Sequence, residues 1–123
     1  MTGASLLRNA EADVMLPVAR THDMVEMYLG DHDPRDPRAS PLYADFTGAP
    51  PVFLSVSETE ILLDDTRRMQ WQLAGQGVAV DVEEARNLPH VWPIFHNTLP
   101  ESRSTLRRVA DWIRRRTGMP AES

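Results

Sequence analysis

The chain has 123 residues, the size of one domain, and a hydrophobic content of 41%, which is too high for a disordered protein. Its net charge of −5 and its pI near 5.3 argue against a broad nucleic-acid-binding surface. Cysteine is absent, which excludes disulfide and thiolate chemistry, and no apolar run approaches the roughly 18 residues that cross a bilayer. The N-terminus lacks a signal-peptide pattern, so we expect a cytoplasmic protein without nucleic-acid or membrane partners.

Residues 1–47 are predicted to form one helix followed by a loop. Pro17 suits the first turn of a helix over residues 18–29, and Gly30 suits its end. Apolar side chains give this helix an uneven apolar face. Three prolines within residues 31–41 exclude a regular helix there, so this segment is a loop that can act as a hinge.

The pattern of residues 48–116 predicts a βαβα core. The apolar run at residues 52–56 follows two prolines and predicts a buried strand. Helical spacing of apolar residues across 62–74 predicts a helix, with two aspartates in its first turn and glycines at its end. Alternation of Val78, Val80 and Val82 with less apolar residues predicts a second strand that has one drier face.

The last predicted helix follows Ser102 or Ser104, either of which can cap its N-terminus. Three arginines occupy its C-terminal turn, where they complement the helix dipole. An inward-facing apolar stripe is expected at Leu106, Val109, Ala110, Trp112 and Ile113. We expect residues 117–123 to form a frayed tail, and residues 1–123 to form a single domain.

The order strand, helix, strand predicts an α/β fold with two parallel strands. Such a sheet is narrow, and its open apolar edge invites pairing with another chain. We therefore expect a homodimer that completes the sheet, with an interface around residues 52–54 or on the apolar face of the helix at residues 18–29.

Glu60 and His90 each follow one of the two predicted strands. Because the carboxyl ends of parallel strands lie at the same edge of a sheet, we expect the two side chains to meet within hydrogen-bonding distance. A carboxylate that is bonded to one imidazole nitrogen fixes the ring tautomer and stabilises the imidazolium formed on proton uptake. The pair therefore suits general-base catalysis, and the alternative is a polar pair without a catalytic role.

Three segments are the most specific part of a wider pattern: Ser-Pro-Leu-Tyr-Ala-Asp at residues 40–45, the run at residues 60–65, and Leu-Pro-His at residues 88–90. In this order they resemble the C-terminal part of bacterial hormone-sensitive-lipase-like carboxylesterases, which have the α/β-hydrolase fold. The resemblance extends over roughly residues 3–116. It implies a truncated α/β-hydrolase in which Glu60 is the acid and His90 the base of the catalytic machinery.

The sequence contains neither a Gly-x-Ser-x-Gly turn, which carries the nucleophile of such enzymes, nor a His-Gly-Gly-Gly oxyanion loop. The missing serine has two conceivable replacements: Ser57, on the same strand end as Glu60, or a water molecule activated by His90. Ser57 is more simply explained as a turn or capping residue. Tyr43 and Trp92 are candidate substrate-binding residues, although packing explains Tyr43 better.

No metal or other cofactor is expected. Asp31, His32 and Asp33 form a cluster of candidate ligands, but no histidine pair at helical spacing supports them. The loop also lacks the glycine and the terminal glutamate of a calcium site, so a solvated acidic loop explains it better.

The sequence leaves two functions open. The first is weak hydrolysis of a small-molecule carboxylester by the His90–Glu60 pair, without the usual serine. The alternative is a non-catalytic fold fragment, or a self-association module that pairs through its open strand edge.

Overall fold

The computed structural model describes residues 3–119. The chain divides at His90 into two compact units, the first ending there and the second beginning at Val91. Among the described residues no helix combines the length and the apolar character that crossing a membrane requires.

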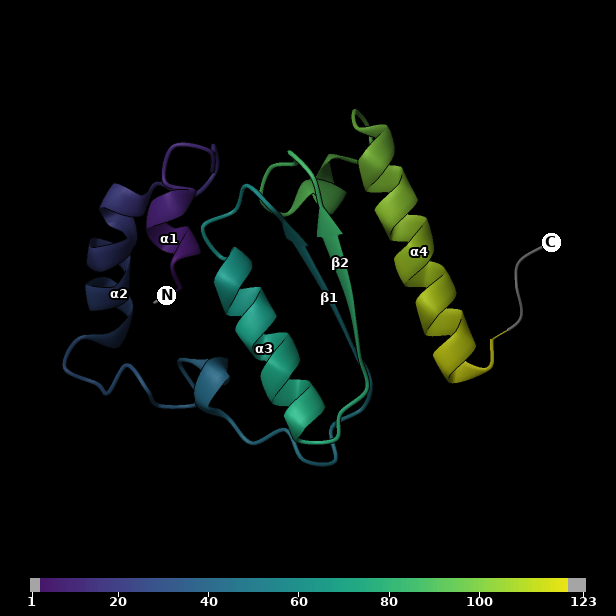
Figure 1. Cartoon of the computed structure of the whole chain (residues 1–123), viewed down its shortest axis with the longest axis horizontal. Helices are drawn as coiled ribbons and strands as arrows, with labels where there is room; N and C mark the ends of the chain where they lie inside the picture. Colours follow the sequence, from purple (N-terminus) through teal and green to yellow (C-terminus); the bar gives the residue numbers. More distant parts are fainter. Residues whose placement is uncertain (1–2, 120–123) are drawn as a thin grey trace. The chain divides into compact units, whose positions relative to one another are not determined.

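The first unit is organised around the predicted pair of parallel strands. β1 (Val52–Ser57) pairs with β2 (Val80–Ala85), with Val52 opposite Val80 and Ser57 opposite Ala85. α3 (Leu63–Gly75) connects the two strands and packs against the sheet they form (Figure 1). The α/β class and the parallel pairing are confirmed, and the carboxyl ends of both strands lie at one edge.

The core of this unit lies between α3 and the strands. Its fully or almost fully buried apolar residues are Val56, Ile61, Leu63, Leu73 and Val78. Asp64 and Asp65 occupy the first turn of α3, as predicted, and Gly77 adopts a positive φ of 77° just beyond its end. Trp71 is 79% exposed, so it does not belong to the inner side of the helix.

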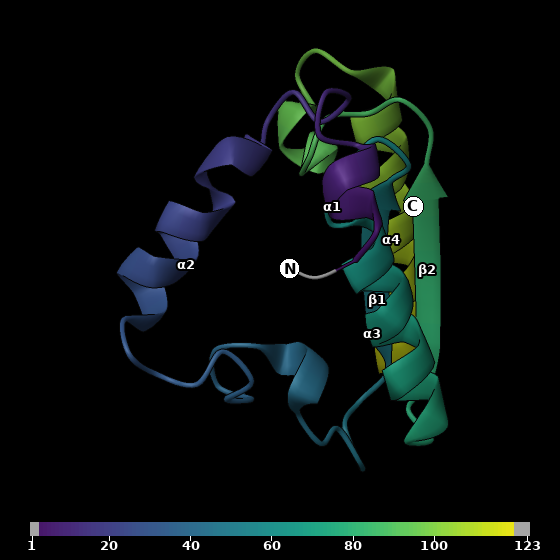
Figure 2. The same cartoon turned by 60° about the vertical axis from the view of Figure 1, so that its left-hand side comes forward.

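α2 (Thr21–Leu29) follows a short 3₁₀ turn, η1 (Val18–Arg20), where the sequence predicted one continuous helix. Gly30 ends it with a φ of 52°, and its N–H bonds to the carbonyl of Glu26, as expected of a glycine stop. No residue of α2 is buried, so its uneven apolar face is not covered within the described residues of this unit. Figure 2 shows α2 lying away from α3. The chain that connects the two helices includes the loop with the 3₁₀ turn η2 (Pro41–Tyr43) and then β1.

A further short helix, α1 (Ser5–Arg8), was not predicted. It has only four residues, too few to be stable by their own propensity. It forms because Ser5 is buried against the start of α3, where its backbone N–H bonds to the Asp64 carboxylate at 2.8 Å.

The second unit consists of η3 (Trp92–Phe95) and α4 (Pro100–Thr117). The predicted start of α4 is wrong: Pro100 occupies the first turn, and no side chain caps the helix. Ser102 instead donates to the Trp92 carbonyl at 2.5 Å. The predicted apolar stripe is only partly buried, since Leu106 and Ile113 are 41% and 44% exposed. Thr117 still belongs to the helix, and residues 120–123 of the expected tail lie outside the described part.

Candidate active site

The turn after β1 positions Glu60. The N–H of Glu60 bonds to the Ser57 carbonyl at 3.0 Å, which closes a tight turn directly after the strand. The Glu60 carboxylate then folds back, and its Oε1 accepts the Ser57 N–H at 2.7 Å. Only 3% of Glu60 is exposed, so this turn holds a carboxylate inside the protein.

The segment after β2 positions His90, and it is tied to the turn after β1. Ser57 Oγ accepts the Leu88 N–H at 3.0 Å, and Thr59 Oγ1 donates to the Leu88 carbonyl at 3.1 Å. Asn87 adopts a positive φ of 51°, a conformation that asparagine tolerates better than most residues. These contacts bring the ends of both strands together and direct the chain toward His90.

The predicted contact between Glu60 and His90 is confirmed. His90 Nδ1 lies 2.5 Å from Glu60 Oε2, slightly closer than the 2.6–3.2 Å that the usual geometry predicts. The carboxylate side chain is 4% exposed and the imidazole 26%. Both carboxylate oxygens of Glu60 are therefore engaged, one by backbone and one by the ring.

This geometry determines which ring nitrogen is available for chemistry. A carboxylate only accepts hydrogen bonds, so Nδ1 of His90 is the donor. In the neutral ring Nε2 then carries the lone pair, and it can take a proton from a group at the partly exposed face. Such an arrangement allows a histidine ring to act as a general base, with the carboxylate holding it in one tautomer.

Three polar residues of the N-terminal segment also contact the Glu60 turn, and sequence reasoning missed them. Ser5, Asn9 and Asp13 are all buried, although their residue types usually lie at the surface. Their spacing of four positions is the one signal that could have placed them on a common face.

The other candidate residues have different surroundings. Ser57 is fully buried, and its Oγ lies 3.1 Å from Thr59 Oγ1 besides accepting from Leu88. Tyr43 is 48% exposed, with the Arg35 guanidinium 5.8 Å from its ring centre. Trp92 is 1% exposed and donates its indole N–H to Thr105 Oγ1 at 3.0 Å within the second unit. A role in substrate binding stays a prediction for Tyr43 and Trp92.

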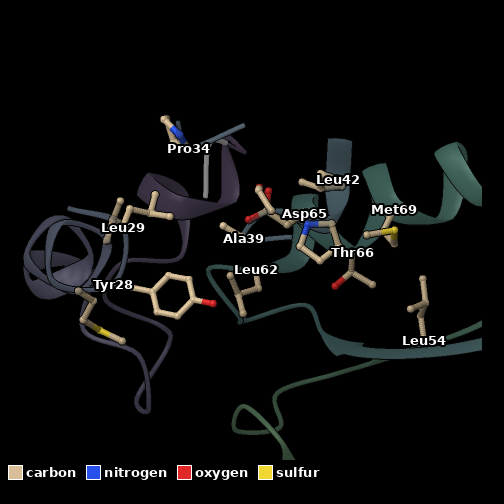
Figure 3. A pocket seen from close by; sticks show the side chains of 14 residues that line it. Tyr28, Leu29, Pro34, Ala39, Leu42, Leu54, Leu62, Asp65, Thr66 and Met69 are labelled. Carbon is tan, nitrogen blue, oxygen red and sulfur yellow. The ribbon is translucent and has the colours of Figure 1, made fainter. Parts of the chain in front are cut away.

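The first unit has several concave surfaces. A small groove of about 270 Å³ borders the segment before His90, with Asp13, Val14, Thr59 and Leu88 among its lining residues. A larger one of about 520 Å³, here called the α2 groove, lies between α2, the η2 loop, β1 and α3. Figure 3 shows the Tyr28 ring extending from α2 toward Leu62. Its main apolar lining residues are Met24, Val25, Tyr28, Leu29, Leu54, Leu62 and Met69.

The loop that contains Asp31, His32 and Asp33 does not bring these side chains together as metal ligands. Within residues 3–119 no group of three histidine, aspartate or glutamate side chains is arranged to hold a metal ion. His32 instead uses Nδ1 for a 3.0 Å contact with the Leu29 carbonyl, and Asp33 accepts the Arg35 N–H at 2.8 Å.

A comparison with protein families identifies the fold. A family model described as alpha/beta hydrolase fold matches residues 2–94, which include β1, α3, β2, Glu60 and His90. The chain belongs to this α/β-hydrolase family. The resemblance expected from the sequence is therefore confirmed.

The relatives of this α/β-hydrolase are esterases and acetyl-hydrolases. An acetyl-hydrolase of Streptomyces hygroscopicus is 36% identical over 94% of this chain and 39% of its own length. An esterase of Acinetobacter venetianus is 31% identical over 91% of this chain and 37% of its own. A crystal structure of an esterase from the bacterial hormone-sensitive lipase family superimposes with a TM-score of 0.89 at 37% identity, over 94% of this chain and 39% of that one.

The chain thus spans about two fifths of the length of these relatives. This share fits the expected C-terminal part of an α/β-hydrolase. The esterase lineage follows from the comparisons, while the activity of this chain is a separate question.

Proposed function

We propose that this chain carries the acid–base part of an ester-hydrolysing site, with His90 as general base and Glu60 as the residue that orients it. The observation that supports the proposal is the 2.5 Å contact between His90 Nδ1 and the buried Glu60 carboxylate. The proposed substrates are small carboxylesters, in line with the acetyl-hydrolase and esterase relatives. The cytoplasm is the proposed place of action.

In the proposed reaction His90 activates water instead of a serine. Nε2 takes a proton from a water molecule, whose oxygen adds to the ester carbonyl carbon. Glu60 stabilises the imidazolium that results, because its carboxylate bonds to the Nδ1–H. Nε2 then returns the proton to the alkoxide as the carbon–oxygen bond breaks, and the products are a carboxylic acid and an alcohol. Without a nucleophilic serine and an oxyanion loop, the rate is expected to be low.

Hydrolysis of p-nitrophenyl acetate by the purified chain tests this proposal. His90→Ala should remove the activity of the chain above the buffer rate, and Glu60→Gln should reduce it, since general-base assistance is worth roughly 10²–10⁴-fold. His96→Ala is the matched control, because His96 is an exposed histidine of the second unit. If the His90 and Glu60 variants hydrolyse the ester as fast as the parent, the pair is not the source of the activity.

A second candidate function is self-association through the first unit. Two observations favour it: β1 has β2 as its partner in a sheet of only two strands, and the α2 groove leaves apolar side chains accessible. In this alternative the chain is a fold fragment whose partner is a second copy of itself, and the Glu60–His90 pair does not take part in catalysis.

A further inference from the structure

The turn that carries Glu60 is held by a polar clamp, which consists of Ser5, Asn9 and Asp13. These residues are 0%, 7% and 8% exposed. Buried polar side chains require hydrogen-bond partners, and all three find them in the backbone of the same short segment, residues 58–64.

Two successive helical turns place the clamp residues on one face of the N-terminal segment. The Asn9 N–H bonds to the Ser5 carbonyl at 2.9 Å, and the Asp13 N–H bonds to the Asn9 carbonyl at 2.9 Å. Residues four positions apart on such turns point the same way. The three side chains therefore meet the Glu60 turn as one row.

Asn9 makes the contacts nearest to Glu60. Its Nδ2 donates one hydrogen to the Glu58 carbonyl at 2.8 Å and one to the Glu60 carbonyl at 2.7 Å. A primary amide carries two N–H donors on one nitrogen, so both are used. Asn9 thereby fixes the backbone on both sides of Thr59, and with it the residue from which the carboxylate extends.

The other clamp residues hold the next part of the segment. Asp13 Oδ2 accepts the Ile61 N–H at 2.9 Å, while its Oδ1 accepts the N–H groups of Met15 and Leu16, both at 3.0 Å. Ser5 Oγ donates to the Ile61 carbonyl at 2.7 Å and accepts the Asp64 N–H at 3.0 Å. Ser5 thus acts at the entry to α3, farther along the chain from Glu60 than Asn9 does.

We infer that Asn9 is a positioning residue: by fixing the Glu60 backbone it keeps the carboxylate on Nδ1 of His90, and so sets the ring tautomer. The inference rests on the proposed function of the pair. The contact at 2.5 Å leaves little room for displacement of Glu60, and a misplacement of about 1 Å can cost roughly 10²-fold in rate.

The test is the ¹⁵N chemical shifts of the His90 ring in the full chain, at a pH where the ring is neutral, with signals assigned from a His90→Gln sample. The wild-type chain should show Nδ1 protonated and Nε2 unprotonated. Asn9→Leu and Asn9→Ala should shift the ring toward the Nε2–H tautomer and lower ester hydrolysis roughly tenfold or more. The alanine variant leaves space for water on the two carbonyls, so it should fold even where the leucine variant does not.

Ser5→Ala is the matched control, because it removes a buried contact of the same clamp farther from Glu60. It should lower the melting temperature yet keep the Nδ1–H tautomer. A change of tautomer in Ser5→Ala as large as in Asn9→Ala would overturn the inference, as would an unchanged tautomer in both Asn9 variants or a failure of both to fold. A wild-type ring without the Nδ1–H tautomer would instead sink the proposed function, and the positioning role with it.

Discussion

Ser57 ties the two strand ends together, and its surroundings suit that structural role. Its Oγ is buried and accepts the Leu88 N–H at 3.0 Å. Ser57→Ala leaves this N–H without its acceptor, so the free energy of unfolding in urea should fall by about 1–3 kcal/mol. Ester hydrolysis should fall far less than in His90→Ala. Labelling of Ser57 by a serine-directed covalent probe would contradict this prediction and make Ser57 the nucleophile.

Asp36 offers a second residue-scale prediction. The side chain of Arg38 donates to its carboxylate, and together with the Arg38 backbone N–H it lowers the pKa of Asp36 from 3.8 to about 2. A carboxyl whose pKa is lower in the folded state stabilises it above the unfolded pKa, and this contribution is lost as the pH falls from 3.8 through about 2.

Arg38→Ala should therefore raise the pKa of Asp36 toward 3.8 in an NMR titration, while the backbone contribution remains. Arg35→Ala is the control, since its side chain lies over Tyr43 and its backbone N–H bonds to Asp33. An equal rise in both variants would mean that the general charge of the loop, rather than the Arg38 contact, determines the pKa.

The sequence predicted the contact between Glu60 and His90 but not the clamp that holds the Glu60 turn. The physical reason is that the clamp residues bond to backbone groups rather than to side chains. Glu60 and His90 follow recognisable strands, so their meeting could be inferred from the parallel topology. Asn9 and Asp13 bond to backbone groups 48 to 51 positions away in the sequence. Nearly every residue type offers the same backbone donor and acceptor. The residue types at positions 58–61 therefore give no sign that their backbone binds a distant side chain.

At the scale of elements, prediction succeeded where burial determines structure. β1 and α3 were predicted from apolar patterns, and both contribute residues to the core of the first unit. β2 was predicted from its alternating valines, of which Val78, just before the strand, is buried. Prediction failed for α1, because this helix depends on a contact between Ser5 and the distant Asp64. It also failed for the start of α4, where Pro100 occupies the first turn and no serine caps the helix. For α2 the helix was predicted, but the sequence cannot show whether a partner surface exists to bury its apolar face.

α3 provides a test of which of its faces forms the core. Leu73 is 1% exposed and Trp71 is 79% exposed on the same helix. Leu73→Ala should lower the free energy of unfolding by about 2–5 kcal/mol, because it leaves a cavity in the core. Trp71→Ala should change it by about 0.5 kcal/mol or less. Urea denaturation of both variants measures this, and a comparable loss for Trp71→Ala would show that the outer face of α3 is also covered in solution.

At the scale of the molecule, the first unit leaves a good deal of apolar surface uncovered. Its sheet has two strands, fewer than most sheets, and the α2 groove exposes side chains of α2 beside Leu54 of β1. Both surfaces expected at a dimer interface, residues 52–54 and the apolar face of α2, contribute to this one groove. A single contact between two copies could therefore cover both.

We accordingly predict that the chain is a homodimer, with twice its mass of 13.9 kDa in light scattering at micromolar concentration. Val25→Glu should dissociate it, because Val25 lines the groove and a charge there would lose its hydration in the interface. Met27→Glu is the control on the same helix, since Met27 is 86% exposed and does not line the groove. A dimer that persists in Val25→Glu would place the interface elsewhere. A wild-type chain with a scattering mass of 13.9 kDa would contradict the prediction of a dimer. It would mean that two strands and one covering helix suffice to keep this unit folded alone.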